Sequence, residues 1–206
     1  MRLRKNPAKP RPIETTARPR IVAAARRHFL AHGFRHVTMD DLAKELGMSK
    51  KTMYAHFPGK SALLEAALLD KFNDLEAELA LITSEGACDF LTGLHRLLSH
   101  VQRHTEEVQP PFLRDVRREP ELFKLIEGRR REVIQRHFRA LLEVGRREGL
   151  IRKDVPVRLI IEILLGAVQT IMNPPRMAEL GLTPKTGFTG IITVVLEGVL
   201  DPKGRR

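Results

Sequence analysis

Residues 50–57, KKTMYAHF, carry many hydrogen-bonding side chains and few that could form a core, and they hold the only tyrosine of a chain without tryptophan. On a helical wheel of 100° per residue, Met53 and Phe57 share one face and Ala55 is the centre of the opposite face. Lysine can bond guanine O6 and N7, an alanine methyl can meet a thymine methyl, and hydroxyls and histidine can hold phosphates. The pattern therefore favours a helix that enters the major groove of DNA over an ordinary solvated helix. The side chains on or beside that face are Lys50, Lys51, Thr52, Tyr54 and His56.

A second candidate group is Arg130 and His137, which fall in the middle of the apolar stripe of a predicted helix over 120–149. Burying a charge is costly without a partner, so two interpretations are open. The side chains pair with internal acids or reach an edge of the core. Alternatively, they project into a ligand cavity and bind an anionic or hydrogen-bonding molecule, which is the hypothesis we follow.

Other candidate chemistry is weaker. His100 and His104 are four residues apart on a predicted helix but have no evident third ligand, so no metal site is expected. Cys88 is the only cysteine, which excludes a disulfide framework. Residues 59–61, GKS, end like a phosphate-binding loop, but Tyr54 stands where that motif requires glycine. No nucleophile and base lie at convincing spacing, so we expect neither an enzyme nor a cofactor.

Short helices must position the face around Ala55. The pattern predicts a helix over about 20–32 that stops at Gly33. A second helix over about 39–46 has Thr38 as its N-cap, with Asp41 three residues later as in a capping box. After Gly47, Ser49 caps the helix over 50–57. Two short helices joined by a glycine-containing turn are the outline of a helix-turn-helix.

Residues 20–64 resemble the DNA-binding domain of the TetR family of bacterial transcriptional regulators. The motifs that carry the resemblance are FLAHGF, the threonine that opens the second helix, LAKELGMS across the turn, TMYAHF, and the Gly-Lys pair before the next helix. Ala55 stands where members of the family commonly have a larger side chain, and Lys51 stands where they frequently have glycine. These differences affect the DNA sequence that is recognised rather than the fold. The resemblance implies phosphate contacts by Thr38, Thr52, Tyr54, His56 and Lys60, and base contacts by Lys50, Lys51 and Ala55.

Positive charge is concentrated in the same third of the chain. Residues 1–72 contain 15 Lys and Arg against 6 Asp and Glu, whereas the other 134 contain 21 against 19. A segregated positive field is typical of a polyanion-binding region, and a solubilising surface is the alternative. Residues 1–15 are basic and proline-containing, and we expect a flexible tail.

The rest of the chain also has helical periodicity. We expect one helix from about 62 to 82 with Ser61 as its N-cap, and further helices over about 90–104, 120–149, 157–172 and 186–200. The last two are apolar over most of their circumference, which indicates a core on one side and a second copy of the chain on the other. Gly166, Gly190 and Gly198 would permit close approach there, and a central position in a monomer is the alternative. TetR-like proteins are typically dimers held by such helices.

These patterns predict an all-α protein with a tail (1–15), a helix-turn-helix domain (16–64) and a larger helical regulatory domain (65–206) for ligand binding and dimerisation. We expect a homodimeric transcriptional regulator that binds a pseudo-palindromic operator in double-stranded DNA and, as a repressor, is released by a small-molecule effector. A nonspecific, architectural nucleic-acid binder is the alternative. We expect an effector cavity lined by parts of 90–104, 112–145 and 160–172, with few aromatic side chains and an aliphatic or anionic ligand. No segment is apolar enough for a membrane span, so we expect a cytoplasmic protein.

Overall fold

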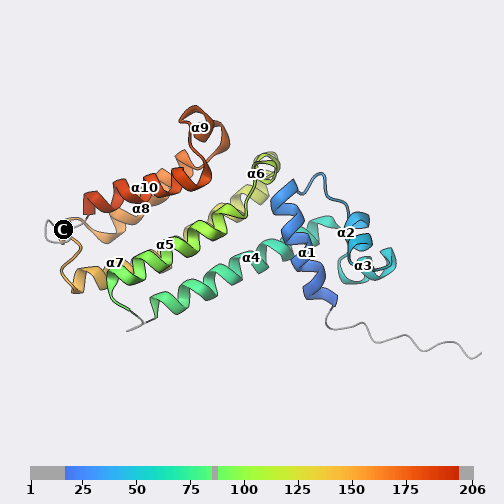
Figure 1. The fold of residues 1–206 in the computed structure, drawn as a ribbon, viewed down its shortest axis with the longest axis horizontal. Helices are drawn as coiled ribbons and strands as arrows, with labels where there is room; N and C mark the ends of the chain where they lie inside the picture. The colour runs from blue at the N-terminus through green and yellow to red at the C-terminus, as the bar shows by residue number, and fades with distance from the viewer. Residues whose placement is uncertain (1–16, 85–87, 200–206) are drawn as a thin grey trace, which may run out of the picture.

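The computed structural model describes residues 17–84 and 88–199, which form ten helices and no β-strand (Figure 1). The chain is therefore all-α, as predicted. The first three helices lie at one end of an elongated molecule, and the long α4 leads away from them toward the remaining helices. The proposed basic tail, 1–15, lies outside the described residues. No helix in the described part of the chain combines the length and hydrophobicity that a membrane-spanning segment needs.

The three helices at the N-terminal end are α1 (Ala17–His32), α2 (Met39–Glu45) and α3 (Lys50–His56). Thr38 caps α2 with a complete capping box, because its hydroxyl accepts from Asp41 N (3.1 Å) while the Asp41 carboxylate accepts from Thr38 N (3.3 Å). Ser49 caps α3 by accepting from Thr52 N (3.1 Å). Gly33 and Gly47 have positive φ values of 81° and 64° in the two turns, where glycine is the residue without a steric cost.

The next helix, α4 (Lys60–Thr83), begins before its predicted start. Its N-cap is Gly59, which makes no side-chain capping bond, so the assignment of Ser61 as N-cap is wrong. A glycine can occupy this position because its extended backbone lets its carbonyl accept the first helical bond, from Leu63 N (3.2 Å).

The C-terminal part is built from four longer helices: α5 (Phe90–Glu106), α7 (Pro120–Arg147), α8 (Val157–Ile171) and α10 (Pro184–Val199). Two short helices, α6 (Pro110–Arg117) and α9 (Pro174–Glu179), were not predicted from the sequence. Both begin with proline in the first turn, where its missing N–H costs nothing.

Two hydrophobic clusters fill the molecule. The first contains residues of α1, α2, α3 and the first half of α4, as far as Leu68. Phe112 and Val116 of α6 complete it. The second joins the end of α4 to α5, α7, α8 and α10, with Phe90, Leu97 and Ile161 almost completely buried. The predicted domain boundary at residue 64 falls within α4, which contributes to both clusters.

Candidate functional site

The candidate DNA-contacting face is on α3. Met53 and Phe57 are 0% and 2% exposed and anchor the helix in the first cluster, as the wheel predicted. Tyr54 is 49% exposed, which leaves a large aromatic side chain at the surface beside basic residues. The exposed side chains Lys50, Lys51, Thr52 and Ala55 lie on the same helix, and His56 is half-buried at its end. The face has the composition that base and phosphate contacts require.

Several of these side chains already have partners. Lys50 forms an ion pair with Asp40 of α2, so its ammonium is shared between that carboxylate and any base it contacts. Lys60 is half-buried and donates from Nζ to the carbonyls of Arg35 and Val37, both at 3.2 Å. Its ammonium thereby holds the α1–α2 turn against the start of α4. Lys51 has no such partner among the described residues and is the freer cation.

Two further contacts fix the orientation of α3 against α1. The guanidinium of Arg18 lies 4.4 Å from the centre of the Phe57 ring, in a cation–π contact. The same side chain donates to the carbonyl of His56 (3.1 Å). Arg18 therefore covers the C-terminal end of α3, where a cation also complements the helix dipole.

A cavity of about 660 Å³ lies between the two hydrophobic clusters. Leu30 and Leu68 in its wall belong to the first cluster, and Ile134 and Val168 belong to the second. The volume is within the range of about 300–1,000 Å³ that small-molecule sites occupy. Five phenylalanines line it, so the expectation of few aromatic side chains is wrong; they are Phe72, Phe112, Phe123, Phe138 and Phe188.

The structure separates the two residues that the sequence proposed as ligand contacts. Arg130 lines the cavity and forms an ion pair with Glu127, one helical turn earlier on α7. His137 does not line this cavity: it is 2% exposed, its Nδ1 lies 2.8 Å from the Thr83 hydroxyl, and its Nε2 lies 3.3 Å from Glu76. Among the two, only Arg130 is placed to meet a ligand in this cavity.

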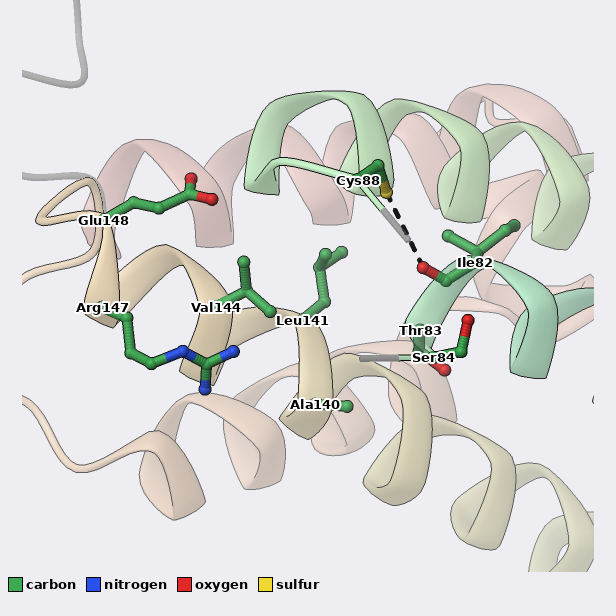
Figure 2. A pocket seen from close by; sticks show the side chains of 9 residues that line it. All are labelled: Ile82, Thr83, Ser84, Cys88, Ala140, Leu141, Val144, Arg147 and Glu148. Carbon is green, nitrogen blue, oxygen red and sulfur yellow. Dashed lines mark hydrogen bonds between the residues drawn. The ribbon is translucent and has the colours of Figure 1, made fainter. Parts of the chain in front are cut away.

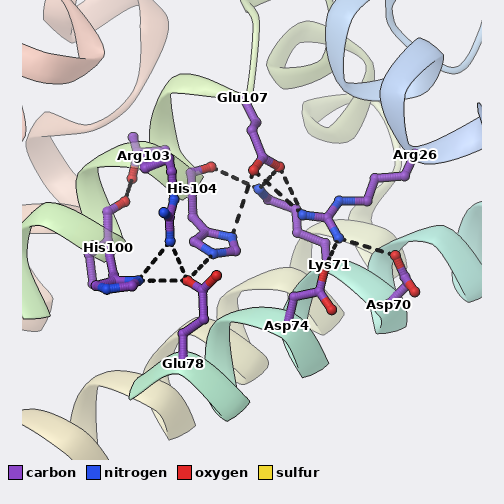
Figure 3. A network of polar contacts seen from close by, with 11 residues as sticks. Arg26, Asp70, Lys71, Asp74, Glu78, His100, Arg103, His104 and Glu107 are labelled. Carbon is purple, nitrogen blue, oxygen red and sulfur yellow. Dashed lines mark hydrogen bonds and ion pairs between the residues drawn. The ribbon is translucent and has the colours of Figure 1, made fainter. Parts of the chain in front are cut away.

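A network of charged side chains connects the cavity to α1 (Figure 3). Lys71 lines the cavity, is 8% exposed, and donates to Glu107 (2.8 Å) and to the carbonyl of His104 (2.8 Å). Glu107 also accepts from Arg26 of α1 (3.1 Å), which in turn pairs with Asp70 and Asp74 of α4. Glu107 is thus shared between a cation in the cavity wall and a cation on α1.

Burial and ion pairing shift the pKa values of Lys71 and Glu107 in opposite directions. Burial lowers the pKa of Lys71, although the hydrogen bond to Glu107 opposes the shift. Burial would raise the pKa of Glu107, but the bonds from Lys71 and Arg26 outweigh it and hold that pKa below its ordinary value. Removing Glu107 would leave the ammonium of Lys71 buried without an acidic partner, whereas removing Lys71 would leave Glu107 still paired with Arg26.

The two histidines considered as metal ligands meet at Glu78. His100 Nδ1 and His104 Nε2 lie 2.7 and 3.0 Å from its Oε2 (Figure 3). Arg103 donates to the same oxygen at 2.6 Å, so a positive charge already occupies the place of a metal ion. No group of three or more His, Cys, Asp or Glu in the described chain is arranged to hold a metal. Burial would raise the pKa of Glu78, but these three partners lower it to about 2.

The short helix α6 has one side on the cavity and the other on the helix-turn-helix. Phe112 and Val116 line the cavity. Between them in sequence, Asp115 is 5% exposed, and its Oδ2 accepts from Arg35 N (2.9 Å) in the turn between α1 and α2. A Cβ on Gly33 in that turn would lie 2.6 Å from the same oxygen. The turn and α6 therefore fit closely and are positioned by one carboxylate.

A second, smaller cavity of about 210 Å³ lies at the opposite end of α4 (Figure 2). Cys88 borders it with its thiol 3.7 Å from the carbonyl of Ile82, and Arg147 and Glu148 lie at its edge. Its lining also includes the hydroxyl side chains of Thr83 and Ser84.

Sequence reasoning missed Lys71 and Arg117 in the cavity wall. Lys71 could have been found, because it stands in the apolar stripe of α4 between Leu68 and Leu75, in the same way that Arg130 stands in that of α7. Arg117 has no such signal, because α6 was not recognised as a helix.

Known proteins share the helix-turn-helix sequence. Residues 21–67 match the family model described as bacterial regulatory proteins, tetR family. The HTH-type transcriptional regulator SrpR of Pseudomonas putida is 36% identical over 61 residues, which are 30% of this chain and 29% of that protein. The match spans less than a third of this curated relative.

Solved structures have the same fold as this chain over most of its length. A TetR-family regulator from Agrobacterium tumefaciens has a TM-score of 0.67 and 20% identity, covering 90% of this chain and 98% of its own. A complex of triclosan with SmeT, the repressor of the Stenotrophomonas maltophilia multidrug efflux pump SmeDEF, has a TM-score of 0.66 and 17% identity, covering 91% and 93%. The capped helix-turn-helix therefore matches the tetR family of bacterial regulatory proteins over residues 21–67, and the described chain shares the fold of these solved structures.

Proposed function

We propose that this regulator is a homodimeric repressor that binds a pseudo-palindromic operator and is released when a small molecule enters the 660 Å³ cavity. The main support for this proposal is that the cavity and the DNA-binding end of the molecule have wall residues in common. Side chains of α1, α4 and α6 that pack the DNA-binding end also line the cavity, so a ligand there touches the elements that position α3. The nearest alternative is a nonspecific nucleic-acid binder.

The surface of α8 and α10 supports the dimer. Leu159 and Ile163 are 49% and 52% exposed and lie four residues apart on α8, and Val194 on α10 is 72% exposed. Gly166 and Gly190 have open space where a Cβ would be, so a second copy could approach their backbones closely. An apolar face of this kind is typical of a four-helix interface about a two-fold axis.

Release by a ligand requires different affinities for two states of the dimer. In the DNA-bound state the two α3 helices enter successive major grooves, about 34–36 Å apart. A ligand that prefers another arrangement of α4, α6 and α7 shifts the population away from that spacing, by no more than its differential affinity. The fold likeness to SmeT, whose complex with triclosan is solved, agrees with a small-molecule ligand.

The experiment is a footprint of the purified protein on the DNA flanking its own gene, with excess nonspecific competitor. We expect a protected site with two-fold symmetry. Diffuse protection that competitor and moderate salt remove would instead indicate the nonspecific binder.

A further inference from the structure

The charges in the cavity wall indicate which chemical class of effector it takes. Lys71, Arg117 and Arg130 are the cations that line it, and Glu127 is the only carboxylate among the lining residues. Lys71 is already balanced by Glu107, which lies outside the wall. Arg117, at the end of α6, has no acidic partner among the residues that the structure describes. The wall therefore has an excess of positive charge that its own groups do not compensate.

Arg130 is the cation best placed to bind a ligand. It is held in the apolar stripe of α7, with 28% of its side chain exposed, and its one acidic partner is Glu127 on the same helix. Its Nε is buried and has no hydrogen-bond acceptor in the structure. An unsatisfied buried donor on a charged group costs free energy, and an acceptor supplied by a ligand would recover it.

The remainder of the cavity suits an aromatic body. Four helices contribute its five phenylalanines: α4, α6, α7 and α10. Aromatic rings in such a wall favour flat partners, which stack or meet them edge to face. A flat cation would gain from the rings but would be repelled by the excess positive charge of the wall, where Arg117 has no acidic partner among the described residues.

We propose that the effector is an aromatic organic anion whose carboxylate or other acidic group binds Arg130 in competition with Glu127. This inference rests on the proposed function, because it names the ligand of the same cavity.

Two fluorescent probes with the same aromatic skeleton test it. Anilinonaphthalene sulfonate carries one anionic group, and N-phenyl-1-naphthylamine lacks it. We expect the sulfonate to bind the wild-type protein about tenfold or more tightly than the neutral probe, as a charge-assisted hydrogen bond predicts.

Variants on α7 assign the difference to one side chain. Arg130→Gln should abolish the preference for the anionic probe, and Glu127→Gln should increase it because the competing carboxylate is gone. Arg129→Gln is the matched control: Arg129 is on the same helix, forms an ion pair three residues away with Glu132 (3.1 Å), and does not line the cavity. It should keep the wild-type preference. Far-UV circular dichroism and the midpoint of thermal unfolding verify that each variant is folded.

The proposal is overturned if the two probes bind equally, if neither binds, or if Arg129→Gln and Arg130→Gln have the same effect. In each of these cases, a symmetric footprint obtained with the same preparation would show that the protein still binds its operator. If the neutral probe released the protein from its operator, the proposed repressor function would be supported and only the proposal of an anionic effector would be rejected.

Discussion

At the scale of single residues, Lys50 and Lys51 are adjacent in sequence but differ in their freedom to contact DNA. Lys50 is paired with Asp40, whereas Lys51 is exposed without a partner in the described chain. A lysine that reaches a base edge distinguishes one base pair from another, and a group that holds a phosphate does not.

Lys51→Ala should therefore change which base pair is preferred at one position in each half-site, by about 1–3 kcal/mol. Tyr54→Phe is the comparison, and it should weaken binding to every sequence alike because its hydroxyl is expected at a phosphate. Competition binding against operators that differ at single base pairs measures both. An unchanged base preference in Lys51→Ala would mean that Lys51 supplies charge alone.

His104 should make stability depend on pH. It is 5% exposed, and burial lowers its pKa below the ordinary value although the hydrogen bond to Glu78 opposes this. The unfolded chain therefore takes up a proton that the folded protein excludes as the pH falls below about 6.5, so His104 makes the fold less stable on acidification.

His104→Gln should flatten the dependence of the free energy of unfolding on pH between 7 and 5, by at most about 1.4 kcal/mol per pH unit. Urea denaturation at several pH values gives the slope. His95→Gln, an exposed histidine of the same helix, is the control. Equal slopes in His104→Gln and the wild type would contradict the assignment.

At the scale of elements, two glycines of α7 show how closely the second hydrophobic cluster is packed. A Cβ on Gly145 would lie 2.7 Å from Ile151 Cγ1 and 2.8 Å from Phe90 Cδ2. A Cβ on Gly128, on the same helix, would meet nothing within 4 Å. The two positions therefore separate the effect of packing from that of helix propensity.

Gly145→Ala should destabilise the protein by about 1–3 kcal/mol through overpacking. Gly128→Ala should stabilise it by up to about 1 kcal/mol, because alanine is the better helix former. The free energy of unfolding of both variants, from denaturant titration, checks the pair. Similar effects of the two substitutions would show that Phe90 and Ile151 move aside readily.

The elements also show what the sequence could predict. Capping residues act within three or four positions, so Thr38, Asp41 and Ser49 marked the starts of α2 and α3 correctly. Ser61 was the wrong cap because a glycine backbone can start a helix without a side-chain bond. The short helices α6 and α9 have too few residues for a periodic pattern to emerge. Their local signals are proline in the first turn and, for α9, the capping residue Asn173.

The cavity could be predicted only in part, because its wall is made by contacts between distant segments. Arg130 was found from its place in an apolar stripe, and the same reasoning placed His137 with it. The two lie on different parts of α7. Glu127, the partner of Arg130, is on the same helix, but Thr83, the partner of His137, becomes evident only when α4 and α7 are packed. Periodicity indicates which face is buried but not what it is buried against.

At the scale of the whole molecule, dimerisation should depend on the exposed face of α8. Ile163→Glu should convert the proposed dimer to a monomer, because it would place two like charges at a two-fold interface, where they cannot be hydrated. Leu81→Glu, at a 73% exposed position on α4, is the control and should remain dimeric. Sedimentation equilibrium gives the mass of each. A dimeric Ile163→Glu variant would place the interface elsewhere.

The position of α6 limits how the proposed effector site could change its ligand. Phe112 and Val116 shape the cavity, while Asp115 between them holds the α1–α2 turn. A substitution on α6 that suits a different ligand therefore also disturbs the turn that leads into the helix-turn-helix. Phe138 and Phe188 line the cavity from α7 and α10 and belong to the second hydrophobic cluster rather than to the one around the helix-turn-helix. Directed evolution toward another inducer should accumulate its changes on α7 and α10 and leave α6 intact.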